Sequence, residues 1–407
     1  MPFCPSTRTS PPPGWHIDPD TGAWMRNTIH NMGRRCRNWD YCGTGTYLIT
    51  LTLNDRSSRI LGRISDTEPR IYLSELGSRI EAHFRKISVF TPEIKVLGVC
   101  VMPDHLHGVL RVERHIAKPL GEHLRGFKIG ATKIAREMGL LSSINAGVQG
   151  IDAGVPARGR GLFADGFVDT ILFDEEAVAN GLAYMRDNPR RLWEKRTHPE
   201  LFKVLRNWQW QSPDRAFNLH FSAIGNLALL NAPALLQVQC SRQYFAYAKG
   251  ADGKLLKNEP PAVITPEFNE KAETLIAAAS HGAVQVNPCI SHGEKEIARR
   301  AFAVGGKVIA LANKGFNPLY KPGGKLFDPC ANGKLLMLAP SAWPYLPGEK
   351  KITRMDACVL NRIAQLLSGK GSVEIDYKGA KIDGIDELVR SAAQALPPST
   401  KEIGWPS

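Results

Sequence analysis

The sequence is poor in cysteine and contains no long apolar run. Its 407 residues include eight cysteines, too few for a disulfide scaffold, so we expect reduced thiols and a cytoplasmic protein. Cys36 and Cys42 are separated by five residues and have no second pair nearby, so no zinc ribbon is indicated. No apolar run reaches the roughly 20 residues of a membrane-spanning helix, and the stretch from Met1 to Gly14 lacks the apolar core of a signal peptide. We therefore expect no contact with a membrane.

Positive charge is what the chain has in excess. There are 52 Lys and Arg against 39 Asp and Glu, giving a net charge of +13. A chain this basic usually binds an anion, and nucleic acid is the first candidate, with an unrelated basic enzyme as the alternative. Residues 1–42 are predicted to form a basic N-terminal extension, which suits either single-stranded nucleic acid or packing on the domain. It places arginines among tryptophans: Trp24, Arg34, Arg35, Arg37 and Trp39.

The first half of the chain alternates apolar strands with amphipathic helices. Short β-branched and apolar runs predict strands, whereas apolar residues three to four apart predict helices. The predicted strands are residues 45–53, 94–101 and 105–112, with a further strand and its approach at 163–173. The predicted helices are residues 71–86 and 119–138, and the Gly-, Ala- and Arg-rich residues 141–161 are predicted to form a mobile basic loop.

Two histidines follow a buried strand and a break at Pro103. Residues two apart on a strand share a face, so His105 and His107 project together while Leu106 points to the opposite side. Two imidazoles side by side on a rigid strand can hold one divalent metal ion. The alternative is an ordinary pair of surface histidines.

A tyrosine lies on a predicted helix that opens at Asp174 with two glutamates. We expect this helix to end near Asn188, because Pro189 discourages its continuation. Tyr184 and Asn188 are four residues apart and share one face of the helix. Taken alone, Tyr184 could be an ordinary core residue.

Together these motifs resemble the HUH single-tyrosine transposases, and most closely the REP-associated tyrosine transposases. The first motif is the run Val-Met-Pro-Asp-His-Leu-His at residues 101–107, with Asp104 where the family usually has Asn. The second is Tyr-Met-Arg-Asp-Asn-Pro at residues 184–189, and Gly-Phe-Val-Asp at 166–169 resembles a further family segment. The resemblance covers about residues 43–215. It implies an α+β HUH endonuclease domain at residues 43–216, with an antiparallel sheet flanked by helices.

The resemblance also implies a reaction. Tyr184 would attack a phosphodiester and form a 5′-phosphotyrosine, with Mg²⁺ or Mn²⁺ held by His105, His107 and Asn188. Asn188 could instead be a plain helix C-cap, and Asp104 either supports the histidines or caps the turn. Family members act as dimers on single-stranded DNA that forms imperfect hairpins. A replication or relaxase-type nicking enzyme is the rival, and the single tyrosine in its Asn-Pro context argues against it.

Basic residues around these motifs are candidates for contact with the DNA strand. Their charge suits phosphate, although a solvated helix face is the alternative. The candidates lie on the helix at 119–138 and at the end of the tyrosine helix: Arg125, Lys128, Arg186, Arg190 and Arg191.

Residues 217–395 are predicted to form a second, α/β domain, followed by a loose tail at 396–407. Strands and helices alternate there, with helices expected at 296–304 and 353–367 and a strand at 307–312, which indicates a parallel sheet. The pattern resembles the SLOG branch of Rossmann-like domains, which includes DNA-processing protein A. Cys240 replaces a family glycine, and residues 291–294 replace its glycine-rich loop.

A helix N-terminus after such a strand suits an anion, so we expect phosphate of DNA or of a nucleotide there. The candidate ligands are Ser241, Arg242, Ser291 and Gly293. The alternative is a structural sheet with an unused pocket. A rival function for the whole chain follows from this domain: a DNA-binding or nucleotide-sensing protein that does not cleave.

Overall fold

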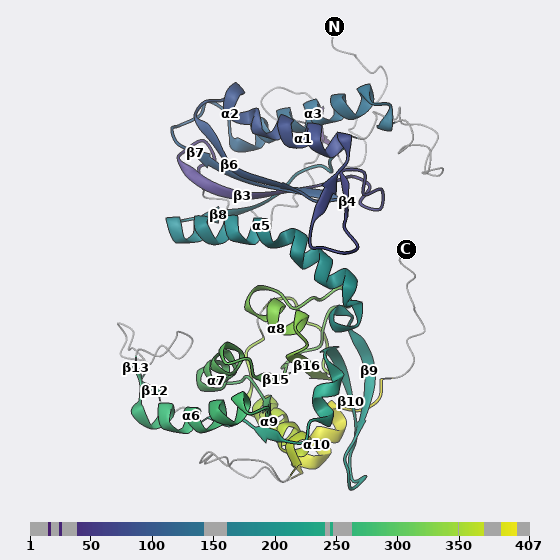
Figure 1. Ribbon diagram of the computed structural model, residues 1–407, viewed down its shortest axis with the longest axis vertical. Helices are drawn as coiled ribbons and strands as arrows, with labels where there is room; N and C mark the ends of the chain where they lie inside the picture. Colours follow the sequence, from purple (N-terminus) through teal and green to yellow (C-terminus); the bar gives the residue numbers. More distant parts are fainter. Residues whose placement is uncertain are drawn as a thin grey trace. The chain divides into compact units, whose positions relative to one another are not determined.

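The computed structural model divides the chain after Trp193 into two compact units, residues 1–193 and 194–407 (Figure 1). It describes residues 15–17, 24–26, 39–141, 161–240, 245–246, 263–348, 350–369 and 384–396. Most of the predicted N-terminal extension, the predicted loop at 141–161 and the predicted tail therefore lie outside the described residues. Within the described part, no helix is both long enough and apolar enough to cross a membrane.

The first unit is built on a four-stranded antiparallel sheet. Its strands are β3 (Gly45–Thr52), β6 (Ile94–Val101), β7 (His105–Val112) and β8 (Val168–Leu172), in the order β6-β7-β3-β8. All three neighbouring pairs are antiparallel. The predicted strands are therefore present, because each is a short apolar run bounded by turn residues. Their antiparallel arrangement is the one that the family resemblance implied.

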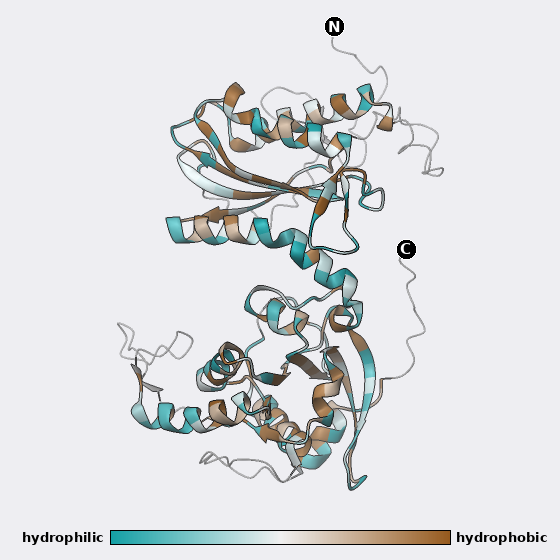
Figure 2. Cartoon of the chain, viewed as in Figure 1, coloured by the Kyte–Doolittle hydropathy of each residue, from teal (hydrophilic) through white to brown (hydrophobic). Residues whose placement is uncertain are grey.

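Helices cover both faces of this sheet (Figure 1). On one face lie α1 (Glu75–Arg85), α2 (Ile87–Phe90) and α3 (Leu120–Glu137), and on the other lies α5 (Glu175–Thr197). The core beneath α1 and α3 contains the alternate side chains Tyr47, Ile49 and Leu51 of β3 together with Leu106 and Leu110 of β7. Figure 2 shows that this sheet is largely hydrophobic, whereas the second half of α5 is largely hydrophilic.

Two glycines let the helices approach the sheet closely. A Cβ atom on Gly108 of β7 would lie 2.3 Å from the Phe84 ring of α1. A Cβ atom on Gly98 of β6 would lie 2.5 Å from Cε of Met185 on α5. The first turn of α5 is held by an ion pair between Arg111 of β7 and Glu175, at 2.7 Å. These contacts set the position of the tyrosine helix over the sheet.

The predicted helix at 71–86 begins later than expected. Residues Ile71–Leu73 form β5, which pairs with β4 (Gly62–Ile64), and α1 starts only at Glu75. Ser74 caps the helix, because its hydroxyl accepts a hydrogen bond from the backbone N–H of Gly77 at 3.0 Å.

The prediction that the tyrosine helix ends at Asn188 was wrong, because α5 continues through Pro189 to Thr197. Proline removes one helical hydrogen bond without forcing the helix to stop. Asp187 bridges the position, since its carboxylate pairs with Arg190 at 2.6 Å and with Arg191 at 2.7 Å on the far side of the proline. Asn188 therefore lies inside the helix and is not its C-cap.

The second unit contains a six-stranded mixed sheet in the order β11-β14-β15-β16-β10-β9. Four strands are parallel: β11 (Leu235–Gln237), β14 (Val284–Asn287), β15 (Lys307–Leu311) and β16 (Leu335–Pro340). Two are added antiparallel: β10 (Asn218–Gly225) and β9 (Leu205–Gln211). The predicted parallel sheet is thus present, with an antiparallel hairpin on one side.

Helices again pack on both faces of this sheet. One core joins β-sheet side chains to α9 (Arg354–Ser368) and α10 (Ile385–Ala392). Another joins the sheet to α6 (Pro266–Ser280), α7 (His292–Ala303) and α8 (Phe327–Ala331). Two small antiparallel pairs complete the described strands, β1 (Trp15–Ile17) with β2 (Trp24–Arg26) and β12 (Phe245–Ala246) with β13 (Val263–Ile264).

Two boundaries in this half differ from the sequence-based expectation. The first unit was expected to reach residue 216, but β9 pairs with β10 and so belongs to the second sheet. The helix expected at 296–304 begins at His292 instead, because Ser291 forms a capping box with Glu294 that organises an earlier first turn.

Candidate active site

The two predicted histidines converge on one point at the α5 side of the sheet. His105 and His107 lie on β7 opposite Thr52 and Thr50 of β3. Their Nε2 atoms are 3.1 Å apart, and their rings are nearly perpendicular, at 87°. Leu106 between them is fully buried in the opposite core, as strand alternation predicted.

Each imidazole is oriented through its other nitrogen. Asp104 Oδ1 lies 2.6 Å from Nδ1 of His105, and Thr50 Oγ1 lies 2.9 Å from Nδ1 of His107. Such contacts fix the ring and direct Nε2 toward a ligand, as is typical of metal-binding histidines. Arg56 extends the chain of contacts, because its Nε and Nη2 both lie 2.8 Å from Oδ2 of Asp104.

The electrostatics favour a neutral imidazole at His107. Burial, aided by the neighbouring His105, lowers the pKa of His107 to about 4. For Asp104, burial opposes ionisation, but the hydrogen bonds and charges of His105 and Arg56 outweigh it and lower its pKa to about 2. At neutral pH the site therefore offers the Nε2 lone pair of His107 beside an ionised carboxylate.

The residues present fit a divalent cation. Adjacent ligands in an octahedral site with bonds of about 2.1 Å are about 3 Å apart, close to the separation of the two Nε2 atoms. Among the described residues, no group of three or more His, Cys, Asp and Glu side chains is gathered for a metal. Within this part of the chain, a third protein ligand would therefore be of another type, such as an amide oxygen.

Asn188 is the amide that the sequence predicted for that role. Its side chain is buried, and its Nδ2 donates a hydrogen bond to the backbone carbonyl of Tyr184 at 3.2 Å. This bond uses the amide nitrogen and leaves Oδ1 without a donor among the described residues. Its assignment as a metal ligand stays a prediction.

Tyr184 lies on α5 beside the histidine pair. Its ring centroid is 6.1 Å from that of His107, and the two planes meet at 74°. The side chain is 42% exposed, so a large substrate can reach it. The structure thus brings together the tyrosine and both histidines, which are 77 to 79 residues apart in the sequence.

The predicted DNA-binding residues lie in different environments. Arg125 is exposed on α3 with Glu122 at 3.7 Å, and Arg186 is exposed on α5. The Lys128 ammonium donates to the backbone carbonyls of Ala164 and Gly166, so it holds the segment before β8. Arg190 and Arg191 both contact Asp187. Contact of any of these with DNA stays a prediction.

The predicted anion site of the second unit is partly filled by the protein's own carboxylate. Ser291 caps α7, and its N–H donates to Oε2 of Glu294 at 2.9 Å. Burial raises the pKa of Glu294 to about 7, although the backbone N–H groups of Ser291 and Ile290 oppose this. Gly293 is buried in the same turn. Ser241 and Arg242 lie outside the described residues, so the anion site stays a prediction. An anion bound there would compete with the Glu294 carboxylate for the same backbone N–H groups.

Sequence reasoning did not identify Thr50 and Arg56 as site residues. A polar Thr50 alternating with buried apolar neighbours was a usable signal, because strand alternation places it on the face opposite Ile49 and Leu51. Arg56 gave no comparable signal, since it lies in an irregular loop after β3.

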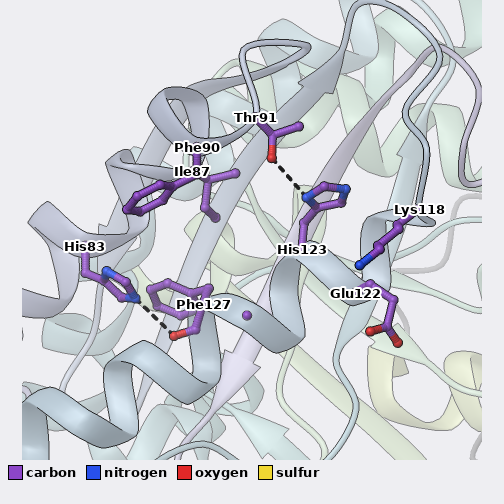
Figure 3. Close-up of a pocket in the computed structure, with 9 residues that line it drawn as sticks. His83, Ile87, Phe90, Thr91, Lys118, Glu122, His123 and Phe127 are labelled. Carbon is purple, nitrogen blue, oxygen red and sulfur yellow. Dashed lines mark hydrogen bonds between the residues drawn. The ribbon is translucent and has the colours of Figure 1, made fainter.

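A pocket of about 390 Å³ lies elsewhere in the first unit, between α1, α2 and α3 (Figure 3). Hydrogen bonds close its sides, from His83 Nε2 to the carbonyl of Phe127 at 3.2 Å and between Thr91 and His123 at 3.0 Å. It belongs to the helical layer on the other face of the sheet from the histidine pair. None of the predicted site residues lines it.

Comparison with known proteins gives partial likenesses. No family model matches the chain. A curated protein of Haemophilus influenzae (strain ATCC 51907 / DSM 11121 / KW20 / Rd), described as an uncharacterized protein, is 24% identical over 172 residues. The match covers 41% of this chain and 91% of that protein.

Two solved structures each resemble part of the chain. One is a REP-associated tyrosine transposase bound to a REP hairpin, 15% identical, with a TM-score of 0.27 over 39% of this chain and 74% of that one. The other is DNA processing protein A from Streptococcus pneumoniae, 20% identical, with a TM-score of 0.25 over 46% of this chain and 59% of that one. Both TM-scores are low.

Proposed function

We propose that this protein is a metal-dependent endonuclease and strand transferase of single-stranded DNA, with Tyr184 as its nucleophile. One observation carries the proposal: the Tyr184 ring lies 6.1 Å from His107, whose Nε2 converges with that of His105 at 3.1 Å. A nucleophile beside an imidazole pair suited to a cation can carry out phosphodiester transfer. The net charge of +13 favours a polyanionic substrate.

The reaction follows from the chemistry of the residues. Tyr184 Oη would attack the phosphorus, forming a phosphotyrosine bond as the bond to the 3′ oxygen breaks. The phenolic proton passes to solvent, and the leaving 3′ oxygen gains a proton from solvent. Attack of the 3′-hydroxyl on the phosphotyrosine reverses the step, so a strand can be rejoined without an external energy source.

Several side chains have distinct tasks in this step. His105, His107 and Asn188 would hold Mg²⁺ or Mn²⁺, and this donor set does not select between the two. The bound ion would neutralise charge on the phosphate. Asp104 and Thr50 keep the imidazoles oriented toward it. The motifs further suggest a homodimer acting on a strand that forms hairpins, and we include both features in the proposal.

A covalent adduct on DNA tests the proposal. Purified protein is mixed with end-labelled, hairpin-forming single-stranded oligonucleotides and Mn²⁺, then separated on a denaturing gel. We expect a shifted, protease-sensitive band with the wild type. Tyr184→Phe should give no adduct yet bind DNA as before, because only the attacking oxygen is lost. His105→Ala and His107→Ala should each lose metal-dependent cleavage.

The opposite results are equally clear. Full activity of Tyr184→Phe would refute the assignment of the nucleophile. A wild type that binds DNA but forms no adduct across a broad oligonucleotide pool would refute cleavage and favour a DNA-binding protein that does not cleave.

A further inference from the structure

The continuation of α5 past Pro189 brings an arginine, Arg191, to the tyrosine. Tyr184 and Arg191 are seven residues apart, which is two helical turns, so they share a face only because the helix does not stop. The guanidinium carbon of Arg191 lies over the Tyr184 ring, 5.2 Å from its centroid. A cation over an aromatic face is attractive, and a planar guanidinium also stacks on it.

Asp187 holds this arginine in place. Its Oδ2 accepts a hydrogen bond from Nε of Arg191 at 2.7 Å, while its Oδ1 accepts one from Nε of Arg190 at 2.6 Å. The two arginines differ in exposure, because the Arg191 side chain is 16% exposed and that of Arg190 is 35% exposed. Arg191 is thus turned into the protein, and Arg190 is the more open to a strand of DNA.

The tyrosine itself has few other restraints. Its hydroxyl makes no hydrogen bond with any described residue, so its direction depends on ring contacts. The two ring contacts are with His107 at 6.1 Å and with Arg191 at 5.2 Å. Removing the arginine would take away one of these two contacts from a ring that is 42% exposed.

We propose that Arg191 is a positioning residue, which fixes the Tyr184 ring for attack and is itself anchored by Asp187, whereas Arg190 contacts the DNA backbone. This inference rests on the proposed function. Misplacement of a reacting group by about 1 Å can cost roughly 100-fold in rate. Loss of Arg191 should therefore slow the chemical step, and loss of Arg190 should weaken DNA binding.

Two neighbouring substitutions of equal charge separate these roles. For Arg191→Gln we expect a 10- to 100-fold lower single-turnover rate of adduct formation at saturating DNA, with the Kd for DNA within about twofold of wild type. Arg191→Lys should recover part of the rate, because an ammonium keeps the charge but not the planar stack. Arg190→Gln should instead raise the Kd and reduce its salt dependence by about one ion, with little change in rate at saturation.

Two further variants complete the design. Asp187→Asn should slow the chemical step in the same direction as Arg191→Gln, because it weakens the anchor. Arg85→Gln is the matched control, since Arg85 forms a similar pair with Glu81 four residues earlier, at 2.7 Å, on a helix of the opposite sheet face. It should behave as the wild type.

A measurement without catalysis separates this inference from the proposed function. Nitration of Tyr184 by tetranitromethane, followed by mass spectrometry of the full-length protein, should be faster in Arg191→Gln than in the wild type and unchanged in Arg190→Gln. Unchanged nitration, or a Kd effect without a rate effect in Arg191→Gln, would overturn the inference.

Should Arg191→Gln fail to fold, Arg191→Lys serves in the same assays. Absence of any wild-type adduct would overturn the proposed function, while the nitration result still decides whether Arg191 restrains the ring.

Discussion

The two histidines of the candidate site are oriented by groups of different kinds. Asp104, an ionised carboxylate, lies beside His105, whereas Thr50, a neutral hydroxyl, lies beside His107. His107 is also the more deeply buried, with 7% of its surface exposed. Its burial has a cost that depends on pH.

At the residue scale, His107 should make the protein less stable in acid. Its pKa falls from an ordinary 6.5 to about 4 in the folded state. Between about pH 6.5 and pH 4, His107 is therefore protonated in the unfolded chain but neutral in the folded protein. The free energy of unfolding consequently falls as the pH falls through this range. The loss is of the order of 2 kcal/mol between pH 7 and pH 4.5. Urea unfolding of metal-free protein at both pH values measures it.

His107→Gln supplies the comparison, because glutamine does not titrate. The free energy of unfolding of this variant should change less between the two pH values than that of the wild type. An equal pH dependence in both proteins would contradict the predicted protonation of His107.

The sequence singled out the candidate residues but not all of the side chains that orient them. The shared face of His105 and His107 followed from the strand period, whereas Tyr184 was singled out by the resemblance of its short motif. Asp104 was adjacent to a histidine and so was visible as a partner. The contact of Thr50 depends on the register of β3 against β7, across more than 50 residues, and no local pattern encodes it.

At the element scale, the distances between sheet and helices depend on two glycines, Gly98 and Gly108, neither of which has a positive φ. Gly108→Ala should destabilise the protein by about 1 to 3 kcal/mol, because the new methyl would overlap the fully buried ring of Phe84. Gly98→Ala should destabilise it less, since its nearest obstacle is the flexible end of Met185. Urea denaturation compares the two.

The two glycine variants should rank in the reverse order for their effect on activity. Gly98 faces α5, so a methyl there would press on the Met185 and Leu182 side chains of the helix that carries Tyr184, whereas Gly108 faces α1. We expect Gly98→Ala to slow adduct formation more than Gly108→Ala at a temperature where both are folded. Equal slowing would indicate that α5 is not positioned through this contact.

Element boundaries were the part of the fold that the sequence predicted least well. The apolar residues of Ile71–Leu73 fit either a helix or a strand. In the fold they form a strand, because they pair with β4. Pro189 is a strong local signal for a helix end, but α5 continues through it, and Asp187 pairs with two arginines beyond it. Because of the same error, the contact of Arg191 with Tyr184 was not predicted, since a helix ending at Asn188 would not carry Arg191 onto the face of Tyr184.

At the scale of the whole molecule, the two units have separate hydrophobic cores. We expect two unfolding transitions in calorimetry. Leu110→Ala, at a fully buried position of the first core, should lower one transition, because such truncations cost about 2 to 5 kcal/mol. Leu338→Ala, fully buried in the second core, should lower the other. A single transition that shifts with both variants would contradict separate cores.

The two transitions should also respond to pH in opposite directions. Burial raises the pKa of Glu294 from 4.5 to about 7, so the folded second unit keeps a proton that the unfolded chain releases. Its stability is therefore highest below about pH 4.5 and falls by roughly 2 kcal/mol as pH rises to 7. His107 gives the first unit the reverse dependence.

As the pH rises from 4.5 to 7, the transition lowered by Leu110→Ala should move up in temperature, and the one lowered by Leu338→Ala should move down. In Glu294→Gln the transition of the second unit should no longer move down with pH, while that of the first unit should still move up. If both wild-type transitions shifted in the same direction, His107 and Glu294 would not govern the pH dependence of the two units.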